Sequence, residues 1–144
     1  MSETRHSRLI IIGSGAAGYT AAIYAARAML EPVLIAGLQP GGQLTITTEV
    51  ENYPGFADVI QGPWLMEQMR AQADKVATEM MSDIIVEADL KTPPFALKRD
   101  SGPTYPADRV TIAPGPQPQW LGLASHPNFT ALGPPPCATL HALI

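Results

Sequence analysis

The sequence predicts an α/β domain in which a partial doubly wound parallel sheet carries a small antiparallel β excursion. Two short apolar runs, residues 9–12 and 33–36, are typical of strands that are buried on both faces of a parallel sheet. A third such run, residues 109–113, is expected to return to the same sheet. Residues 19–30, between the first two runs, are rich in alanine and contain no proline or glycine, which favours a helix.

A glycine pattern joins the first predicted strand to this helix. Gly13, Gly15 and Gly18 give G-x-G-x-x-G, in the strand–turn–helix order of a Rossmann-like FAD- or NAD(P)-binding domain. We expect Gly13 to permit the tight turn, Gly15 to let a pyrophosphate approach the backbone, and Gly18 to let the helix pack against the strand. The helix N-terminus would then offer free N–H groups and a partial positive charge to the phosphates. The alternative is a tight turn without a ligand.

The end of the second predicted strand lacks an acidic residue. Such an acid often binds a ribose hydroxyl in dinucleotide-binding domains, but Ala36 occupies this position here. The pattern therefore predicts a pyrophosphate site without specifying NAD. The following loop, residues 37–43, is rich in turn-forming residues, and residues 44–55 are polar, threonine-rich and expected to be extended. That segment either is a surface excursion or lines a ligand.

The middle of the chain predicts a second helix and a hairpin. The helix is expected to open at residues 62–63, because proline suits the first turn of a helix. Apolar residues then recur at helical spacing from Leu65 to Met80, which predicts one buried face. The antiparallel excursion is expected at about residues 84–105, with a hairpin turn at residues 100–102.

The composition limits the possible partners and the compartment. The chain has 144 residues, enough for one domain or for part of a larger one. Its formal net charge of −4 argues against a nucleic-acid-binding surface, and no apolar run approaches the length that spans a membrane. Residues 1–7 contain no signal-peptide core, and a single cysteine excludes an intrachain disulfide and suits a reducing compartment. We therefore expect a cytoplasmic protein and no metal site.

Several blocks of sequence occur in an order that is specific to one family. They are residues 13–22, 41–44, 47–55, 62–63, 65–66, 120–123 and 137–139. Together they strongly resemble low-molecular-weight thioredoxin reductase of the bacterial, fungal and plant type. The Thr-Glu-Val-Glu-Asn block at residues 48–52 separates this family from other Rossmann-like proteins. The resemblance runs from about residue 7 to residue 139.

The resemblance implies that FAD, rather than free NAD, binds at the glycine turn. Residues 14–17 would face the FAD pyrophosphate, and residues 36–43 would run along the adenosine ribose and the diphosphate. Asn52 would lie near the flavin, and the backbone of Ile85 would meet the adenine end. The cofactor-binding residues carried over by position are Gly13, Ser14, Gly15, Ala16, Ala17, Gly18, Ala36, Gly37, Gly41, Gly42, Gln43, Asn52 and Ile85.

The chemistry of the resembled family implies further partners. The family reduces thioredoxin: electrons pass from NADPH to FAD, then to a redox-active Cys-x-x-Cys pair, and finally to thioredoxin. The flavin supplies the two-electron chemistry, and the protein positions the partners. The resemblance thus implies an NADPH-dependent thioredoxin-disulfide reductase, which is a homodimer when complete.

The resemblance also divides the chain into two parts. Residues 1–116 would be the N-terminal part of the FAD-binding domain. Residues 117–144 would be a proline-rich linker with the remnant of the redox-motif segment. The NADPH-binding domain is expected to be absent.

The chain departs from the family pattern at its redox motif. The family has Cys-Ala-x-Cys-Asp, whereas this chain reads Cys-Ala-Thr-Leu-His at residues 137–141. Cys137 is thus the remnant of the catalytic pair, because Leu140 replaces the partner cysteine and cannot resolve a mixed disulfide. We therefore expect this chain alone to be inactive. Residues 113–115 depart as well, reading Ala-Pro-Gly where the family has Ala-Thr-Gly.

Two other interpretations remain open at this point. In the first interpretation, the chain is a flavin- or dinucleotide-binding module without catalysis. In the second, Cys137 and His141 would form a thiol–imidazole pair on a helix, because they lie four residues apart. The prolines at residues 134–136 leave little scaffold for that pair.

Overall fold

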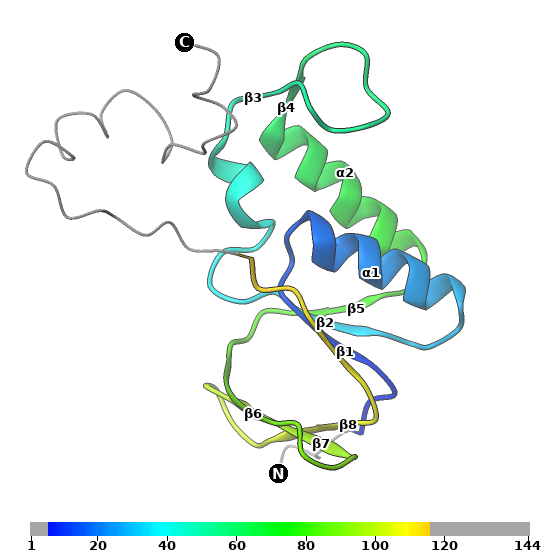
Figure 1. The fold of residues 1–144 in the computed structure, drawn as a ribbon, viewed down its shortest axis with the longest axis vertical. Helices are drawn as coiled ribbons and strands as arrows, with labels where there is room; N and C mark the ends of the chain where they lie inside the picture. Colours follow the sequence, from blue (N-terminus) through cyan, green and yellow to red (C-terminus); the bar gives the residue numbers. More distant parts are fainter. Residues whose placement is uncertain (1–5, 116–144) are drawn as a thin grey trace, which may run out of the picture.

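Four short parallel strands form the central sheet of the computed structural model, which describes residues 6–115 (Figure 1). The strands lie in the order β5, β2, β1 and β9, so the first strand of the chain lies inside the sheet. Parallel pairs such as Ile10 with Val33 and Ile10 with Val110 set the register. The bounds are Ile10–Ile12 for β1, Val33–Ile35 for β2, Glu79–Met81 for β5 and Val110–Ile112 for β9.

The two inner strands are buried on both faces, which confirms the prediction from their apolar runs. Ile10, Ile11 and Ile35 have no exposed surface. Because side chains alternate along a strand, Ile11 and Leu34 pack with the helices, while Ile10 and Ile35 pack with the antiparallel sheet. This alternation requires an apolar residue at every position and explains why the aliphatic run is unbroken.

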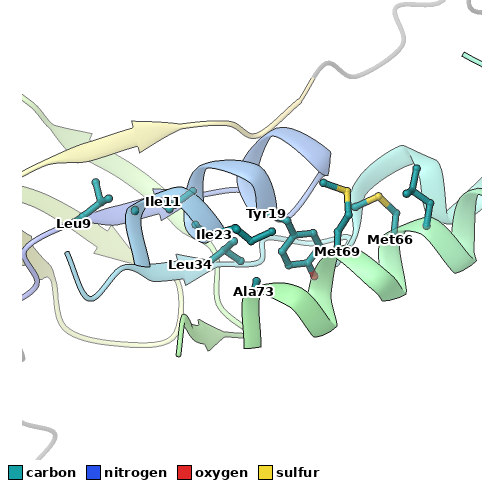
Figure 2. Close-up of a cluster of buried hydrophobic side chains, with 11 residues drawn as sticks. Leu9, Ile11, Tyr19, Ile23, Leu34, Met66, Met69 and Ala73 are labelled. Carbon is teal, nitrogen blue, oxygen red and sulfur yellow. The ribbon is translucent and has the colours of Figure 1, made fainter. Parts of the chain in front are cut away.

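Helices α1 (Ala16–Arg27) and α2 (Gly62–Lys75) lie side by side over one face of the parallel sheet (Figure 1). Figure 2 shows Tyr19 of α1 close to Met66 and Met69 of α2 in the core that the helices close. The methionines therefore fill core space, as their helical spacing predicts. The buried side chains of this cluster are Leu9, Ile11, Tyr19, Ala22, Ile23, Ala25, Leu34, Leu65, Met66, Met69 and Ala73.

A three-stranded antiparallel sheet, in the order β6, β7 and β8, covers the opposite face (Figure 1). Leu97 and Ala107 are fully buried and share one cluster with Ile10 and Ile35 of the central sheet. This sheet is the predicted antiparallel excursion, and its hairpin turn follows β7. The bounds are Ile85–Asp89 for β6, Phe95–Arg99 for β7 and Tyr105–Ala107 for β8.

The second helix is shorter than predicted, because the apolar pattern was expected to continue it to Met80. α2 ends at Lys75, and Ala77 has a left-handed backbone with a φ of 61° that turns the chain. Residues 79–81 then form β5, an additional parallel strand beside β2 that the sequence did not predict. Met80 fits both a helical pattern and a strand pattern, because a single apolar residue after a turn does not define a periodicity.

The first helix also differs from its predicted bounds of 19–30. It begins at Ala16, inside the glycine pattern, and ends at Arg27. Met29 and Glu31 both have positive φ angles, 55° and 49°, and such left-handed residues stop a helix. The earlier start places the first turn of α1, with its free amides, directly after the glycine turn.

The threonine-rich segment is not extended throughout. Gly42–Ile46 form the 3-10 helix η1, which packs against α2. Glu49–Val50 follow as the short strand β3 and pair antiparallel with β4 (Ile60–Gln61). A side chain at Gly62 would overlap the carbonyl of Leu44, so glycine at the start of α2 allows the close approach of η1. This tertiary contact overrides the β propensity of the threonines.

Within residues 6–115, none of the helices combines the length and the hydrophobicity of a membrane-spanning segment. No group of three or more His, Cys, Asp or Glu side chains in the same range is arranged to hold a metal ion. The predicted boundary at residue 116 lies at the edge of the described residues, so the division of the chain into two parts stays a prediction.

Candidate dinucleotide-binding site

The turn after β1 has a backbone that requires glycine at its first position. Gly13 has a φ of 105°, a conformation that L side chains rarely adopt. A side chain there would also overlap the backbone of Ala113 and Pro114. The amide of Gly13 donates a 2.8 Å hydrogen bond to the carbonyl of Ile35, which ties the turn to the end of β2. These contacts confirm the predicted tight turn at Gly13.

Gly18 and Gly42 pack closely against the backbone of the glycine turn. A side chain at Gly18 would overlap the carbonyl of Gly13, so α1 approaches the turn as closely as predicted. Gly42 has a φ of 66°, and a Cβ there would lie 3.2 Å from the Cα of Gly15. Both glycines are therefore needed for packing, and neither lines the adjoining pocket.

Gly15 faces open space. A Cβ at Gly15 would meet no atom within 4 Å, and its φ of −69° suits any L residue. Gly15 is the N-cap residue of α1, and no side chain caps this helix. The first amides of a helix have no partner inside it and carry a partial positive charge. Open space beside uncapped amides is the arrangement by which helix N-termini bind phosphate.

Ser14 joins the glycine turn to the loop after β2. Its side chain is buried, and its hydroxyl donates a 2.9 Å hydrogen bond to the carbonyl of Ala36. The same hydroxyl accepts a 3.0 Å hydrogen bond from the amide of Gly41. These two bonds hold the loop of residues 37–41 beside the glycine turn.

A pocket of about 740 Å³ lies where these segments meet. Its volume falls within the range of roughly 300–1,000 Å³ that is usual for small-molecule sites. Leu38 and Gln39, which belong to the predicted 36–43 stretch, also line it. The individually predicted residues that line it are Gly13, Ser14, Gly15, Ala16, Ala17, Ala36, Gly37, Gly41, Gln43 and Ile85.

Several other pocket residues were not named as site residues from the sequence, although Leu44 and Ile46 belong to the segment 44–55, which was expected either to lie at the surface or to line a ligand. Ile12 ends β1, and residues 113–115 directly follow β9, so both sets lie at the carboxyl ends of parallel strands. Ligands of open α/β sheets bind at these ends, and this rule was the available signal. The additional lining residues are Ile12, Leu44, Ile46, Ile84, Ala113, Pro114 and Gly115.

The remaining predicted residues are not part of this pocket. Asn52 is exposed, lies shortly after β3 and does not line the pocket. Its place near a flavin stays a prediction. Cys137, Leu140 and His141 lie outside the described residues, and the proposed redox motif is therefore untested by the structure.

No side chain that lines the pocket in the described part of the chain is ionisable. The charge of a phosphate would be met by backbone amides and by the N-terminus of α1. The carboxylate next in sequence to a lining residue is Asp83, which is buried and ion-paired to Arg99. Burial raises the pKa of Asp83, but the Ile84 amide, the Ser101 hydroxyl and the Arg99 guanidinium together bring this pKa below its usual 3.8.

The chain matches the family described as pyridine nucleotide-disulphide oxidoreductase over residues 7–133. A thioredoxin reductase from Rickettsia conorii is 54% identical over 133 residues, which are 92% of this chain and 43% of that relative. A glucosaminate ammonia-lyase from Pseudomonas fluorescens is 51% identical over 139 residues, which are 96% of this chain and 43% of that relative. The chain thus spans less than half the length of these curated relatives.

A solved structure shows the same architecture. Thioredoxin reductase from Giardia duodenalis has a TM-score of 0.76 and 35% sequence identity to this chain, covering 87% of this chain and 40% of that one. The resemblance to thioredoxin reductase and the α/β fold class are therefore confirmed over the matched part. Because two curated relatives with different names share this segment, the segment identifies the family and leaves the reaction to be proposed.

Proposed function

The chain belongs to the pyridine nucleotide-disulphide oxidoreductase family, and we propose that it is the FAD-binding portion of a thioredoxin reductase-like flavoprotein. In this proposal the FAD pyrophosphate lies against the glycine turn, and the adenosine lies along the loop after β2. When bound, FAD would supply two-electron redox chemistry. The residues of this chain would bind and orient it.

The main support for a pyrophosphate at the glycine turn is the open space beside Gly15. Gly13 and Gly18 are packed against backbone atoms, whereas a Cβ at Gly15 would meet no atom within 4 Å. A Ser, Asp or Asn at this N-cap position would satisfy a free amide of α1, and glycine does not. A ligand that brings its own anionic oxygen atoms explains both the space and the uncapped helix.

The rest of the pocket fits a dinucleotide that is held by neutral groups. Ala36 directly follows β2, at the position where many domains have an acidic residue that binds a ribose. Gln39 and Gln43 line the pocket, and their amides can donate to and accept from ribose hydroxyls. We place Ile85 at the adenine end and Asn52 near the flavin.

The reaction of a full-length protein of this kind is a separate part of the proposal, because the chain covers only 43% of the length of its curated relatives. That reaction would reduce thioredoxin, as the names of the relatives suggest, and NADPH would be its pyridine nucleotide, the class of cofactor in the description of the family. A homodimer and a cytoplasmic location complete the proposal. The single cysteine supports the location, because such a chain suits a reducing compartment.

One observation favours a second function, which is dinucleotide binding without catalysis. Leu140 stands where a disulfide reductase of this family needs its second cysteine. In that case the site would hold FAD, and the chain would not exchange disulfides.

The experiment is a titration of the purified 144-residue chain with FAD, followed by flavin fluorescence and absorbance. We expect saturable one-to-one binding that ADP competes away, because ADP contains the pyrophosphate and the adenosine. Equal affinity for FMN and FAD would contradict the proposal, since FMN has neither an adenosine nor a pyrophosphate. Absence of FAD binding to the folded chain would contradict both candidate functions.

A further inference from the structure

A buried carboxylate directly precedes two residues that line the pocket. Asp83 stands between β5 and β6, and its side chain is 4% exposed. Its Oδ1 accepts a 2.8 Å hydrogen bond from the amide of Ile84. Its Oδ2 accepts hydrogen bonds from Arg99 Nε at 2.5 Å and from the Ser101 hydroxyl at 2.8 Å. Both oxygens therefore have partners, and two of these come from the end of β7 and the following turn.

The guanidinium of Arg99 is itself held in place. It lies 4.3 Å from the ring centroid of Tyr105 and donates a 3.0 Å hydrogen bond from Nη2 to Ser101. The Tyr105 hydroxyl donates to the sulfur of Met81 at 3.2 Å. A stacked, planar guanidinium loses little additional freedom when it forms its hydrogen bonds. The contacts thus connect β7 and β8 back to the end of β5.

The two residues after Asp83 form part of the pocket, and their segment is held by backbone hydrogen bonds. The carbonyl of Asp83 accepts a 3.0 Å hydrogen bond from the amide of Gly37, and the carbonyl of Ile84 accepts one from the amide of Asp100 at 3.0 Å. Gly37, Ile84 and Ile85 all line the pocket. Gly37 follows the end of β2, where domains of this type bind the adenosine ribose.

We propose that Asp83 is a positioning residue that holds residues 83–85 against Gly37 and so shapes the wall that receives the adenosine end of FAD. This inference rests on the proposed FAD-binding function. A pocket wall recognises a ligand only when supporting groups keep it in place. An apolar residue at position 83 would leave the Ile84 amide, Arg99 and Ser101 without their shared acceptor.

The test compares Asp83→Asn with Asp89→Asn in the 144-residue chain. Asparagine preserves the size of the side chain and one acceptor oxygen but removes the charge. Asp89 is a matched control, because it is an exposed carboxylate on β6 that accepts a 3.1 Å hydrogen bond from the amide of Lys91. The measured quantities are amide hydrogen exchange at Gly37 and Gly13, and the dissociation constants for FAD and ADP.

Because Asp83→Asn also lowers global stability, exchange should rise at both amides, and we expect the rise at Gly37 to be about tenfold larger than the rise at Gly13, which bonds to Ile35. The dissociation constants for FAD and ADP should rise together, by about tenfold, because both ligands contain the adenosine. Asp89→Asn should change none of these quantities. Ser101→Ala removes a single hydrogen bond to Asp83 and should give a smaller change in the same direction, even if Asp83→Asn folds poorly.

Three results would overturn the inference. Unchanged exchange at Gly37 would show that Asp83 does not hold the segment. An equal rise in exchange at Gly13 and Gly37 would indicate a general loss of stability. Asp83 would then have only a structural role. Faster exchange at Gly37 with unaltered binding of FAD and ADP would show that the wall does not receive the adenosine. If the wild-type chain binds neither ligand, the proposed function fails together with the cofactor part of this inference, and exchange at Gly37 still decides the rest.

Discussion

The hydroxyl of Ser14 accepts a 3.0 Å hydrogen bond from the amide of Gly41, which lies 27 residues further along the chain. The bond joins the glycine turn to the loop after β2, and both residues line the same pocket. Ser14 is 2% exposed, so water cannot replace a lost partner at this place. The Ser14 hydroxyl therefore contributes to the stability of the fold and holds the loop of residues 37–41 at the pocket.

Ser14→Ala should leave the Gly41 amide buried without its partner. We expect the free energy of unfolding to fall by about 1–3 kcal/mol, the usual cost of an unsatisfied buried group, and FAD to bind more weakly. Urea unfolding measures the first quantity. Thr20→Ala is the control, because it removes an exposed hydrogen bond from the Thr20 hydroxyl to the Ala16 carbonyl and should cost under about 0.5 kcal/mol. Equal losses in the two variants would contradict the role given to Ser14.

Gly15→Val should abolish FAD binding while the chain remains folded. The valine side chain enters open space, at a φ that it tolerates, and takes the place proposed for the pyrophosphate oxygens. Replacing glycine at this N-cap costs about 1 kcal/mol of stability, which a thermal melt would detect. Gly102→Val provides the matched control, because Gly102 also has no atom within 4 Å and lies outside the pocket. Retention of FAD by Gly15→Val would place the pyrophosphate elsewhere.

The ion pair between Asp83 and Arg99 should make stability depend on pH. Because the pKa of Asp83 is lower in the folded chain than in the unfolded chain, the folded state binds fewer protons. The ion pair therefore stabilises the fold above about pH 4, and this contribution is lost as the pH falls through the folded pKa. At pH 7, Asp83→Asn should be less stable by about 3 kcal/mol, since Arg99 loses its partner.

The measurement for this prediction is urea unfolding of the wild type and of Asp83→Asn from about pH 3 to pH 7. The difference in the free energy of unfolding between them should shrink on acidification below about pH 4. A difference that stays constant over this range would show that Asp83 has the same pKa in both states.

The glycine turn was predictable because the residues that determine it are adjacent in the sequence. The apolar run before Gly13 and the alanine-rich segment after Gly18 specify a strand and a helix within one local pattern. The same locality explains the hairpin of the antiparallel sheet. Most of the predicted pocket lining belongs to this turn and to the loop that Ser14 attaches to it.

Other parts of the fold depend on contacts between distant residues and could not be predicted in this way. β5 is a strand because residues 79–81 pair with β2, not because of their own composition. η1 forms where Leu44 meets Gly62 of α2. Nothing in the sequence singled out Asp83, because its partner Arg99 lies 16 residues further along the chain.

The chain should not reduce thioredoxin with NADPH, because it has only one cysteine. A thiolate at Cys137 can attack a disulfide and form a mixed disulfide, which needs a second thiol for its release. Leu140 has no sulfur, and the 144 residues contain no second G-x-G-x-x-G that would bind a nicotinamide dinucleotide beside FAD. The measurement is NADPH-dependent reduction of thioredoxin by the purified chain, with turnover at background as the expected result.

Leu140→Cys separates the two causes of this inactivity. The variant has two thiols three residues apart, and mild oxidation should lower its titrated thiols from two per chain to none through an intrachain disulfide, while the wild type keeps its one. NADPH-dependent turnover should still be absent, because the variant gains a dithiol and no dinucleotide site. Turnover by the wild type would contradict the prediction and would require both a resolving thiol from the substrate and a nicotinamide-binding site within the 144 residues. Failure of the variant to form a monomeric disulfide would show that positions 137 and 140 do not come together in this chain.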